Sequence, residues 1–212
     1  TKAVSGEEKV EQYSAYIKQA AEHLLALING ILDVSKIQAG KLSVDLEKVT
    51  IDPILDGCLP IIEAKAKEKS ITIDRHVAPN MAALLADPLR IKQIVINLLS
   101  NAVKFTPNKG RVRIDVNPRG ATHAAISVSD TGIGMGPEEI QTAMRPFGQV
   151  DSGFNKRHEG TGLGLPIAYA LARLHGGDLQ IESSKGLGTR VTVIIPLYVP
   201  QNTSPTGPER QN

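Results

Sequence analysis

The stretch Asn97-Leu98-Leu99-Ser100-Asn101-Ala102-Val103-Lys104-Phe105 is the most informative part of this 212-residue sequence. It closes a helix expected to run from Asp87 to about Lys104, since Asp87 is a good N-cap and Pro88 fits the first helical position. One side of that helix is apolar and should be buried: Ile91, Val95, Leu98 and Ala102. The other side is polar and repeats at helical spacing: Arg90, Gln93, Asn97, Asn101 and Lys104.

The polar side of this helix carries two amides and an ammonium group. Asparagine is a poor helix former, and a face that simply meets solvent would more naturally use Glu or Lys. The neutral oxygens of Asn97 and Asn101 suit Mg²⁺, and the charge of Lys104 suits phosphate. The pattern indicates a metal and phosphate site, with an ordinary solvated stripe as the alternative.

A second motif, Asp130-Thr131-Gly132-Ile133-Gly134, follows directly after an alternating strand. An ionised Asp130 only accepts hydrogen bonds, so it can accept one from the exocyclic amine of adenine, whereas guanine presents a carbonyl there. The glycines leave room for the edge of a flat ring. A plain Asp-Gly turn is one alternative. Asp-Thr-Gly also occurs in retroviral-type aspartic proteases, but those short β-rich chains fit the long helices expected here badly.

A third motif, Gly160-Thr161-Gly162-Leu163-Gly164, opens a helix with Pro166 in its first turn. The free N–H groups and the dipole of a helix N-terminus attract phosphate, and glycine lets the backbone come close to it. By itself the run is weak evidence, because it lacks the Lys-Ser/Thr of a P-loop and no strand directly precedes it.

The irregular stretch 144–159 separates the second motif from the third. A segment of this length inside a domain is uncommon unless it is a lid or is disordered. Phe147 and Phe154 could anchor such a lid, while Lys156 and Arg157 could reach a terminal phosphate. A solvated basic loop is the alternative for the two basic residues.

The remaining pattern predicts an α/β domain. Strands are expected at about Leu46–Ile51, Ser70–Val77, Ala83–Ala86, Arg111–Val116, Ala124–Ser129, Asp178–Ser183 and Thr189–Pro196, with a turn at Asn117–Gly120 and further helices at Pro53–Lys69, Pro137–Ala143 and Leu163–His175. The run Gly186-Leu187-Gly188-Thr189 is typical of a hairpin turn, although Thr189 could place a hydroxyl beside a bound base.

The chain begins with a different pattern, the heptad repeat of a coiled coil or helix bundle. The main apolar row is Tyr13, Ile17, Ala20, Leu24, Leu27, Ile31 and Val34, and a second row of Ala21, Leu25, Ile28 and Leu32 widens it. This width suits a four-helix bundle. A helix over about residues 10–39, with Gly40 as its C-cap, is expected. One helix cannot bury such a face alone, so it needs partners.

Composition narrows the class of protein further. A net charge of +2 without a Lys/Arg block argues against nucleic acid as a partner. The single cysteine excludes disulfide frameworks and Cys-based zinc sites, and it fits a reducing compartment. No apolar run approaches the ~20 residues needed to span a bilayer. We therefore expect a cytoplasmic location and no membrane contact by this chain, whether or not a longer parent protein is membrane-anchored.

In this order, the motifs resemble the ATP-binding domain of sensor histidine kinases of two-component systems, within the gyrase, chaperone, kinase and mismatch-repair ATPase superfamily. Asn97–Phe105 resembles the N box, Asp130–Gly134 the G1 box, Pro146-Phe147-Gly148 the F box and Gly160–Gly164 the G2 box. The helix ending Leu32-Asp33-Val34-Ser35-Lys36-Ile37 resembles the second helix of the dimerisation and phosphotransfer hairpin. The resemblance covers about residues 10–197.

The resemblance implies an α/β fold, specifically an α+β two-layer sandwich with a mixed sheet and helices on one face, preceded by a long bundle-type helix. Residues 1–42 would be the remnant of the dimerisation and phosphotransfer hairpin, and residues 43–198 the ATP-binding catalytic domain. Residues 199–212, rich in Pro, Asn, Gln, Ser and Thr, are expected to be a disordered tail.

The resemblance also assigns roles, with ATP and Mg²⁺ as cofactors. Asn101 would hold Mg²⁺, and Asp130 would read adenine. Asn97, Lys104 and Arg157 would form the catalytic set. The expected nucleotide contacts are Asn97, Asn101, Lys104, Asp130, Gly132, Ile133, Gly134, Phe147, Gly160, Thr161, Gly162, Leu163, Gly164 and Thr189.

Two details refine the expected reaction. Hydrolysing members of the superfamily carry glutamate at the position of Asn97 as general base for water, and an amide cannot take that proton. Transfer to a better nucleophile, such as imidazole, is therefore expected. The acceptor motif His-Glu-x-Arg-Thr-Pro matches none of His23, His76, His123, His158 and His175. We expect the first hairpin helix to be absent from this chain, with Thr1–Gln12 the remnant of the connecting turn.

The sequence thus predicts the catalytic ATP-binding part of a protein histidine kinase. The parent protein, a homodimer, would transfer the γ-phosphoryl group of Mg·ATP to a histidine for relay to the receiver domain of a response regulator. This chain alone is not expected to phosphorylate itself. The alternatives are a nucleotide- or regulator-binding module without turnover, or a related ATP hydrolase.

Overall fold

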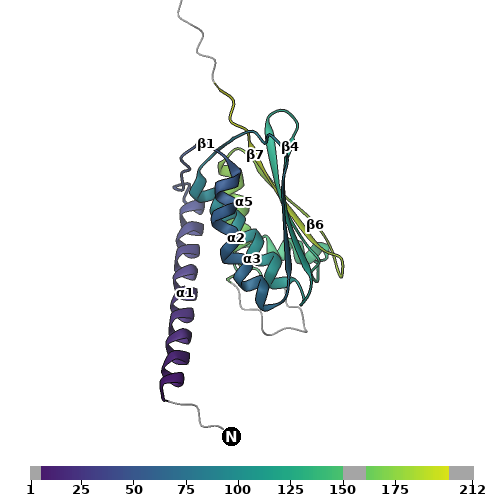
Figure 1. The fold of residues 1–212 in the computed structure, drawn as a ribbon. Helices are drawn as coiled ribbons and strands as arrows, with labels where there is room; N and C mark the ends of the chain where they lie inside the picture. Colours follow the sequence, from purple (N-terminus) through teal and green to yellow (C-terminus); the bar gives the residue numbers. More distant parts are fainter. Residues whose placement is uncertain (1–5, 150–160, 201–212) are drawn as a thin grey trace, which may run out of the picture.

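A computed structural model describes residues 6–149 and 161–200. A long helix, α1 (Gly6–Gln38), runs beside an α/β domain and extends well past it (Figure 1). The helix begins earlier than the sequence predicted, so a connecting turn over Thr1–Gln12 is wrong for residues 6–12. Glu, Lys and Gln dominate those residues, and they are good helix formers.

The end of α1 lies where the sequence placed it. Gly40 has a φ of +64°. Its N–H donates to the carbonyl of Ile37 at 3.0 Å, and the N–H of Lys41 donates to the carbonyl of Lys36 at 2.8 Å. This is a Schellman motif, in which the left-handed glycine lets two bonds close the last turn. The expected C-cap is confirmed.

The domain is built on a mixed sheet of five strands in the order β2-β4-β5-β7-β6. These strands are β2 (Thr72–Val77), β4 (Arg111–Arg119), β5 (His123–Asp130), β7 (Gly188–Pro196) and β6 (Asp178–Ser184). Only the β2–β4 pair is parallel. A separate short pair, β1 (Glu47–Val49) with β3 (Leu84–Ala86), is antiparallel.

Helices cover one face of this sheet (Figure 1). They are α2 (Ile51–Glu68), α3 (Pro88–Phe105) and α5 (Gly164–Leu174), and a short helix, α4 (Pro137–Ala143), follows β5. Alternate residues of β4, namely Val112, Ile114 and Val116, point toward the helices and are fully buried. Each buried aliphatic side chain of this size contributes roughly 1.5–3 kcal/mol. The expected two-layer α/β sandwich is confirmed.

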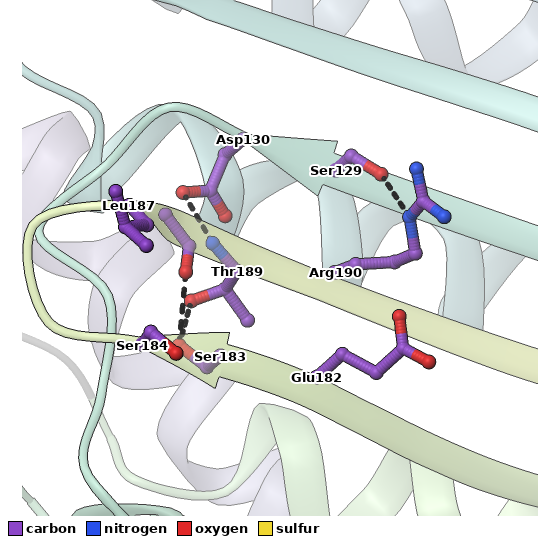
Figure 2. A pocket seen from close by; sticks show the side chains of 9 residues that line it. Ser129, Asp130, Glu182, Ser183, Ser184, Leu187, Thr189 and Arg190 are labelled. Carbon is purple, nitrogen blue, oxygen red and sulfur yellow. Dashed lines mark hydrogen bonds between the residues drawn. The ribbon is translucent and has the colours of Figure 1, made fainter.

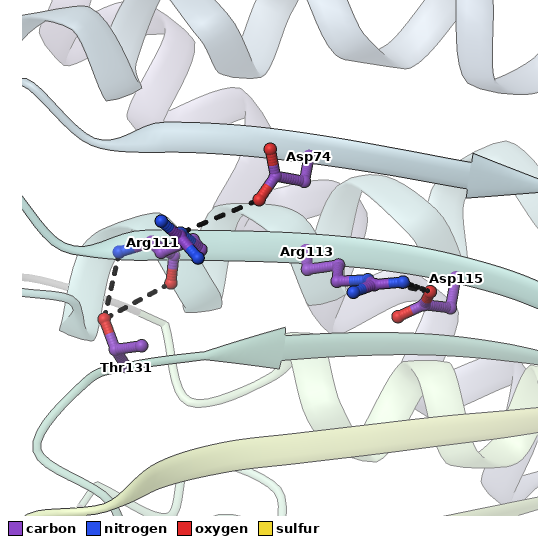
Figure 3. A network of polar contacts seen from close by, with 5 residues as sticks. All are labelled: Asp74, Arg111, Arg113, Asp115 and Thr131. Carbon is purple, nitrogen blue, oxygen red and sulfur yellow. Dashed lines mark hydrogen bonds and ion pairs between the residues drawn. The ribbon is translucent and has the colours of Figure 1, made fainter.

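The other face of the sheet is polar. Arg111 forms an ion pair with Asp74 on β2 at 3.7 Å, and Arg113 pairs with Asp115 along β4 at 2.8 Å (Figure 3). Thr131 also joins β4, because its hydroxyl accepts from the backbone N–H of Arg111 at 2.9 Å. Charged side chains on this face explain why the strands alternate so regularly in the sequence.

One turn differs from the prediction. The expected turn at Asn117–Gly120 lies later, because β4 continues to Arg119 and pairs with His123 on β5. Pro118 is tolerated inside β4 because β2 pairs with β4 only as far as Val116, which leaves this end of the strand with one neighbour.

Candidate functional site

The start of α3 sets the position of its polar face. The side chain of Asp87 accepts from the backbone N–H groups of Leu89 at 3.0 Å and Arg90 at 3.1 Å, which confirms the predicted N-cap. The backbone N–H of Asp87 donates to Nε2 of the buried His175 at 3.1 Å. The beginning of α3 is therefore anchored to the end of α5.

In the middle of α3, two amides meet the beginning of α5. The Asn97 side chain donates to the carbonyl of Gly164 at 3.2 Å. A Cβ on Gly164 would lie 3.6 Å from Cγ of Asn97 and 3.7 Å from Nδ2 of Asn101. The N-terminus of α5, which attracts anions, is thus next to two neutral amide groups. Two sequence motifs whose contacting residues are 67 positions apart meet here, as expected.

The first turns of the same polar face have a different role. Gln93 donates to the carboxylate of Asp33 on α1 at 2.7 Å, and the Arg90 guanidinium lies 3.6 Å from the same carboxylate. Arg90 also donates to the side-chain oxygen of Gln93 at 2.9 Å. These two residues attach α1 to the domain, so only the second half of the polar stripe belongs to the candidate site.

The end of α3 has a partner that the sequence did not indicate. The ammonium of Lys69 donates to the carbonyls of Val103, Lys104 and Thr106 at 3.0, 2.7 and 3.2 Å. It thereby satisfies carbonyl groups that every helix end leaves free. Burial lowers the pKa of Lys69.

Lys104 lies close to this capping group. Its ammonium is 4.7 Å from the centre of the Phe105 ring. Burial and the positive charge of Lys69 lower the pKa of the Lys104 ammonium below the usual value for lysine. A desolvated ammonium of this kind gains from an anion that comes close to it.

Asp130 lies at the end of β5 with one oxygen engaged. Oδ1 accepts from the backbone N–H groups of Gly132 at 2.8 Å and Thr189 at 3.3 Å. No hydrogen bond within residues 6–149 and 161–200 ends on Oδ2. Burial raises the pKa of this carboxyl, although the two backbone bonds act in the opposite direction. One oxygen is thus held in place while the other can serve a ligand.

The glycines near Asp130 are needed for packing between chain segments. A Cβ on Gly134 would lie 1.9 Å from the carbonyl oxygen of Ser184, and one on Gly188 would lie 1.9 Å from that of Asp130. A Cβ on Gly132 would lie 2.7 Å from the carbonyl oxygen of Phe105. Room for a flat ring, the reason expected from the sequence, is therefore not the whole reason for these glycines. Gly134 and Gly188 let the loop after β5 pack on the β6–β7 hairpin, and Gly132 lets it pack on the end of α3.

Asp130 and Thr189 border a pocket of about 320 Å³ at this end of the sheet (Figure 2). The pocket is lined by Ser129, Asp130, Glu182, Ser183, Ser184, Leu187, Gly188, Thr189 and Arg190. Of the predicted contacts nearby, Ile133 is half exposed, and its carbonyl accepts from Gly186 at 2.7 Å.

The segments that flank the expected lid lie together. The N–H of Phe147 donates to the carbonyl of Gly162 at 3.0 Å, and a Cβ on Gly162 would lie 2.8 Å from the Phe147 backbone. The hydroxyl of Thr161 accepts from the N–H of Leu163 at 3.2 Å. The Leu163 side chain is buried. Arg157 and Gly160 lie outside the described residues.

The site geometry has a counterpart among known proteins. Histidine kinase-, DNA gyrase B- and HSP90-like ATPases match residues 86–199, just over half of the chain. The chain belongs to this ATPase family. The matched range runs from Ala86, the last residue of β3, to the residues just after β7, and it includes every motif that the sequence singled out in the domain.

Curated relatives of this chain include histidine kinases. An uncharacterized sensor-like histidine kinase of Rhizobium meliloti is 38% identical over 189 residues, which is 89% of this chain and 36% of the relative. The circadian input-output histidine kinase CikA of Synechococcus elongatus is 40% identical over 191 residues, 89% of this chain and 25% of the relative. The chain therefore spans about a third or less of these proteins.

Solved structures agree. Full-length ShkA in complex with AMPPNP has a TM-score of 0.76 at 27% identity, over 94% of this chain and 41% of ShkA. The mycobacterial sensor histidine kinase MprB has a TM-score of 0.64 at 26% identity, over 71% of this chain and 98% of that one. The chain therefore shares its fold with histidine kinases and is similar to their ATP-binding part. Among its described residues, no helix is both long and apolar enough to cross a membrane.

Proposed function

We propose that the parent protein transfers the γ-phosphoryl group of Mg·ATP to a histidine, for relay to an aspartate in the receiver domain of a response regulator. The observation that carries this proposal is the contact of Asn97 and Asn101 with the N-terminus of α5 at Gly164. Phosphoryl transfer needs mainly positioning and charge neutralisation, and this contact supplies amides, N–H groups and a helix dipole in one place.

Different residues of the site bind different parts of ATP in this proposal. Asp130 accepts from the exocyclic amine of adenine through Oδ2, with Thr189 beside it on β7. Lys104 and the N-terminus of α5 receive the phosphates, and Asn97 helps to orient them. Arg157 is proposed to act on the terminal phosphate.

Asn101 is the proposed protein ligand of Mg²⁺. The fit is chemical, because a neutral amide oxygen close to a phosphate-binding helix start suits a cation that keeps most of its ligands as water and phosphate. Bound Mg²⁺ would neutralise phosphate charge. Asn101 would fix the cation beside Asn97, which lies one helical turn earlier on the same face.

Transfer is favoured over hydrolysis by Asn97. Its amide donates to Gly164 and cannot take a proton from water. Without a general base at this position, the terminal phosphate needs an acceptor that is already a good nucleophile, such as imidazole. A hydrolase is therefore the weaker candidate.

Helix α1 supports a homodimeric parent. Its heptad rows are largely exposed, with Tyr13, Ile17, Leu24, Leu25 and Leu32 each more than half exposed. Apolar rows of this kind are buried in helix bundles. We propose that they pack against the other hairpin helix and a second copy in the parent. ATP as substrate and a buried, free Cys58 favour the cytoplasm for this part of the protein.

The test is phosphoryl transfer in trans. The chain is mixed with Mg·[γ-³²P]ATP and a separately produced helical hairpin that carries the acceptor histidine of a close relative. We expect an acid-labile, base-stable phosphohistidine on the hairpin, and none when its acceptor histidine is replaced. ATP binding by calorimetry without any labelled hairpin would favour a binding module. Steady phosphate release without an acceptor would favour a hydrolase.

A further inference from the structure

The hydroxyl of Ser183, on β6, makes three hydrogen bonds at the edge of the pocket. Figure 2 shows the two that join it to the beginning of β7. Oγ of Ser183 lies 2.7 Å from the backbone N of Met135, 3.0 Å from the carbonyl oxygen of Gly188 and 2.9 Å from Oγ1 of Thr189. The first contact comes from the loop after β5, and the other two come from the beginning of β7. One hydroxyl thus joins the two segments that hold Asp130.

The directions of these hydrogen bonds follow from counting protons. A serine hydroxyl has one proton to donate and two lone pairs to accept with. The carbonyl of Gly188 can only accept, so it takes the Ser183 proton. The N–H of Met135 can only donate, so it uses one lone pair. The assignment that satisfies all three contacts has the Thr189 hydroxyl donating its own proton to the lone pair that remains.

The consequence falls on Thr189. With its proton directed to Ser183, Oγ1 of Thr189 can only accept a hydrogen bond from a ligand. Asp130 is the cross-strand partner of Thr189, and its ionised carboxylate also only accepts. Both residues line the same pocket. At the Asp130–Thr189 pair, both side chains therefore present acceptors to a ligand.

We propose that Ser183 is a positioning residue for nucleotide-base specificity, because it holds the Thr189 hydroxyl as an acceptor. A ring edge with an exocyclic amine satisfies this arrangement. A ring with a carbonyl at that position, as in hypoxanthine or guanine, brings a third acceptor against two others there, and its N1–H lies one ring position away from the exocyclic group. The inference rests on the proposed binding of adenine nucleotide, and it adds the group that keeps the selectivity high.

The experiment compares ADP with inosine diphosphate, which replaces the exocyclic amine by a carbonyl. Dissociation constants for both, without Mg²⁺, are measured by calorimetry on the whole chain. In Ser183→Ala the Thr189 hydroxyl is free to rotate and donate, so the preference for ADP should fall about five- to tenfold, the scale of one neutral hydrogen bond. Ser183→Thr keeps the hydroxyl and should retain the preference.

Two further variants test whether Ser183 acts by orienting the Thr189 hydroxyl or only by holding the loop in place. If Thr189→Val is already present, adding Ser183→Ala should leave the ratio of the two dissociation constants unchanged, since no hydroxyl remains to rotate. Ser127→Ala, which removes a β5 hydroxyl bonded to Thr192 on the open face, should leave the ratio at its wild-type value. If Ser183→Ala does not fold, Ser183→Cys supplies a weak donor of similar shape for the same comparison.

The outcomes are distinct. Equal weakening of ADP and inosine diphosphate in Ser183→Ala would mean that Ser183 only supports the loop, and would overturn this inference while leaving the proposed function intact. A wild-type chain that binds no ADP would overturn both. A loss of preference confined to backgrounds that contain the Thr189 hydroxyl would support the inference.

Discussion

Gly30 on α1 lies directly against Leu163, the residue before α5, and a Cβ on Gly30 would stand 2.9 Å from Cδ1 of Leu163. Gly30 and Leu163 are both buried. The contact lies close in sequence to the Asp33–Gln93 hydrogen bond. Helix α1 is therefore packed on the N-cap residue of α5, the candidate phosphate-binding helix, so we expect a shift of α1 to change the surroundings of the proposed nucleotide site.

Enlarging Gly30 should loosen this contact. Gly30→Leu is expected to destabilise the docked position of α1 by about 1–3 kcal/mol, the usual cost of overpacking. Gly30→Ala should cost much less, because the nearest atom is the end of a side chain and alanine favours the helix by about 1 kcal/mol. Amide hydrogen exchange of residues 30–38 and 163–167 is the measurement. The matched control is Asn29→Ala at an exposed neighbour, and equal exchange in all variants would contradict the prediction.

Replacing Asp130 by asparagine should weaken ADP binding. Asp130→Asn is expected to cost about 1.5–3 kcal/mol, since a hydrogen bond to a charged group is lost and an amide donor can face the amine. Calorimetry checks this, and an unchanged dissociation constant would rule out the base-reading role.

The raised pKa of Asp130 adds a pH dependence with two opposite signs. Affinity for ADP should fall as the pH falls through the folded-state pKa, because a protonated carboxyl accepts less well. The free energy of unfolding should instead rise as the pH falls from that pKa to the ordinary aspartate range, because the folded state binds the proton more tightly than the unfolded state. Asp130→Asn should lack both changes. The same pH profile in wild type and variant would mean that another group titrates.

Two glycines of one hairpin should respond very differently to alanine. Gly186 has a φ of +78°, and a Cβ added there would have nothing within 4 Å, so Gly186→Ala should cost only the backbone strain of about 1–2 kcal/mol. Gly188, with a φ of +91°, adds a clash of 1.9 Å with the carbonyl oxygen of Asp130. Gly188→Ala should therefore be clearly less stable in urea and should also weaken ADP binding, because it displaces Asp130. Equal losses in both variants would show that strain alone matters.

Removing the cap on α3 should affect both stability and Lys104. Lys69→Met is expected to destabilise the domain by roughly 1–3 kcal/mol, because partly buried carbonyls lose their donor. The pKa of Lys104 should rise toward its usual value, because a nearby positive charge is lost. Urea unfolding and NMR titration of ¹³C-labelled lysines measure the two effects. Lys67→Met, at an exposed position in the last turn of α2, should change neither.

Local patterns were sufficient for much of the fold. The N-cap at Asp87, the C-cap at Gly40 and the bounds of α4 each depend on neighbouring residues, and all three were predicted. Most strand positions followed from alternation, since one face of the sheet is buried and the other is charged. The start of α1 and the β4–β5 turn were misplaced, because helix propensity and the continued pairing of β4 with β5 outweighed the local signals used.

In the candidate site, too, local sequence patterns identified some residues, whereas contacts distant in sequence decided the others. The polar period on α3 identified Asn97, Asn101 and Lys104, but it could not show that Arg90 and Gln93 on the same face bind Asp33. The role of Lys69 could not be predicted from the sequence, because its three acceptors lie 34 to 37 residues further along the chain. Ser183 gave only a weak signal in the sequence. It follows Leu179 and Ile181 at alternate positions of β6, where another apolar residue would be expected, and it carries a hydroxyl instead.

The sequence by itself determined the residue types, their order and their periods, and therefore the family, the ATP chemistry and the two-layer arrangement. Tertiary structure alone decided which groups meet: Gly30 with Leu163, Lys69 with the end of α3, and Ser183 with both Met135 and Thr189. The physical reason is the distance along the chain over which each kind of interaction acts. Capping, amphipathicity and turn chemistry act between residues close in the chain, whereas hydrogen-bond direction, burial and pKa depend on atoms brought close only when helices and sheet pack.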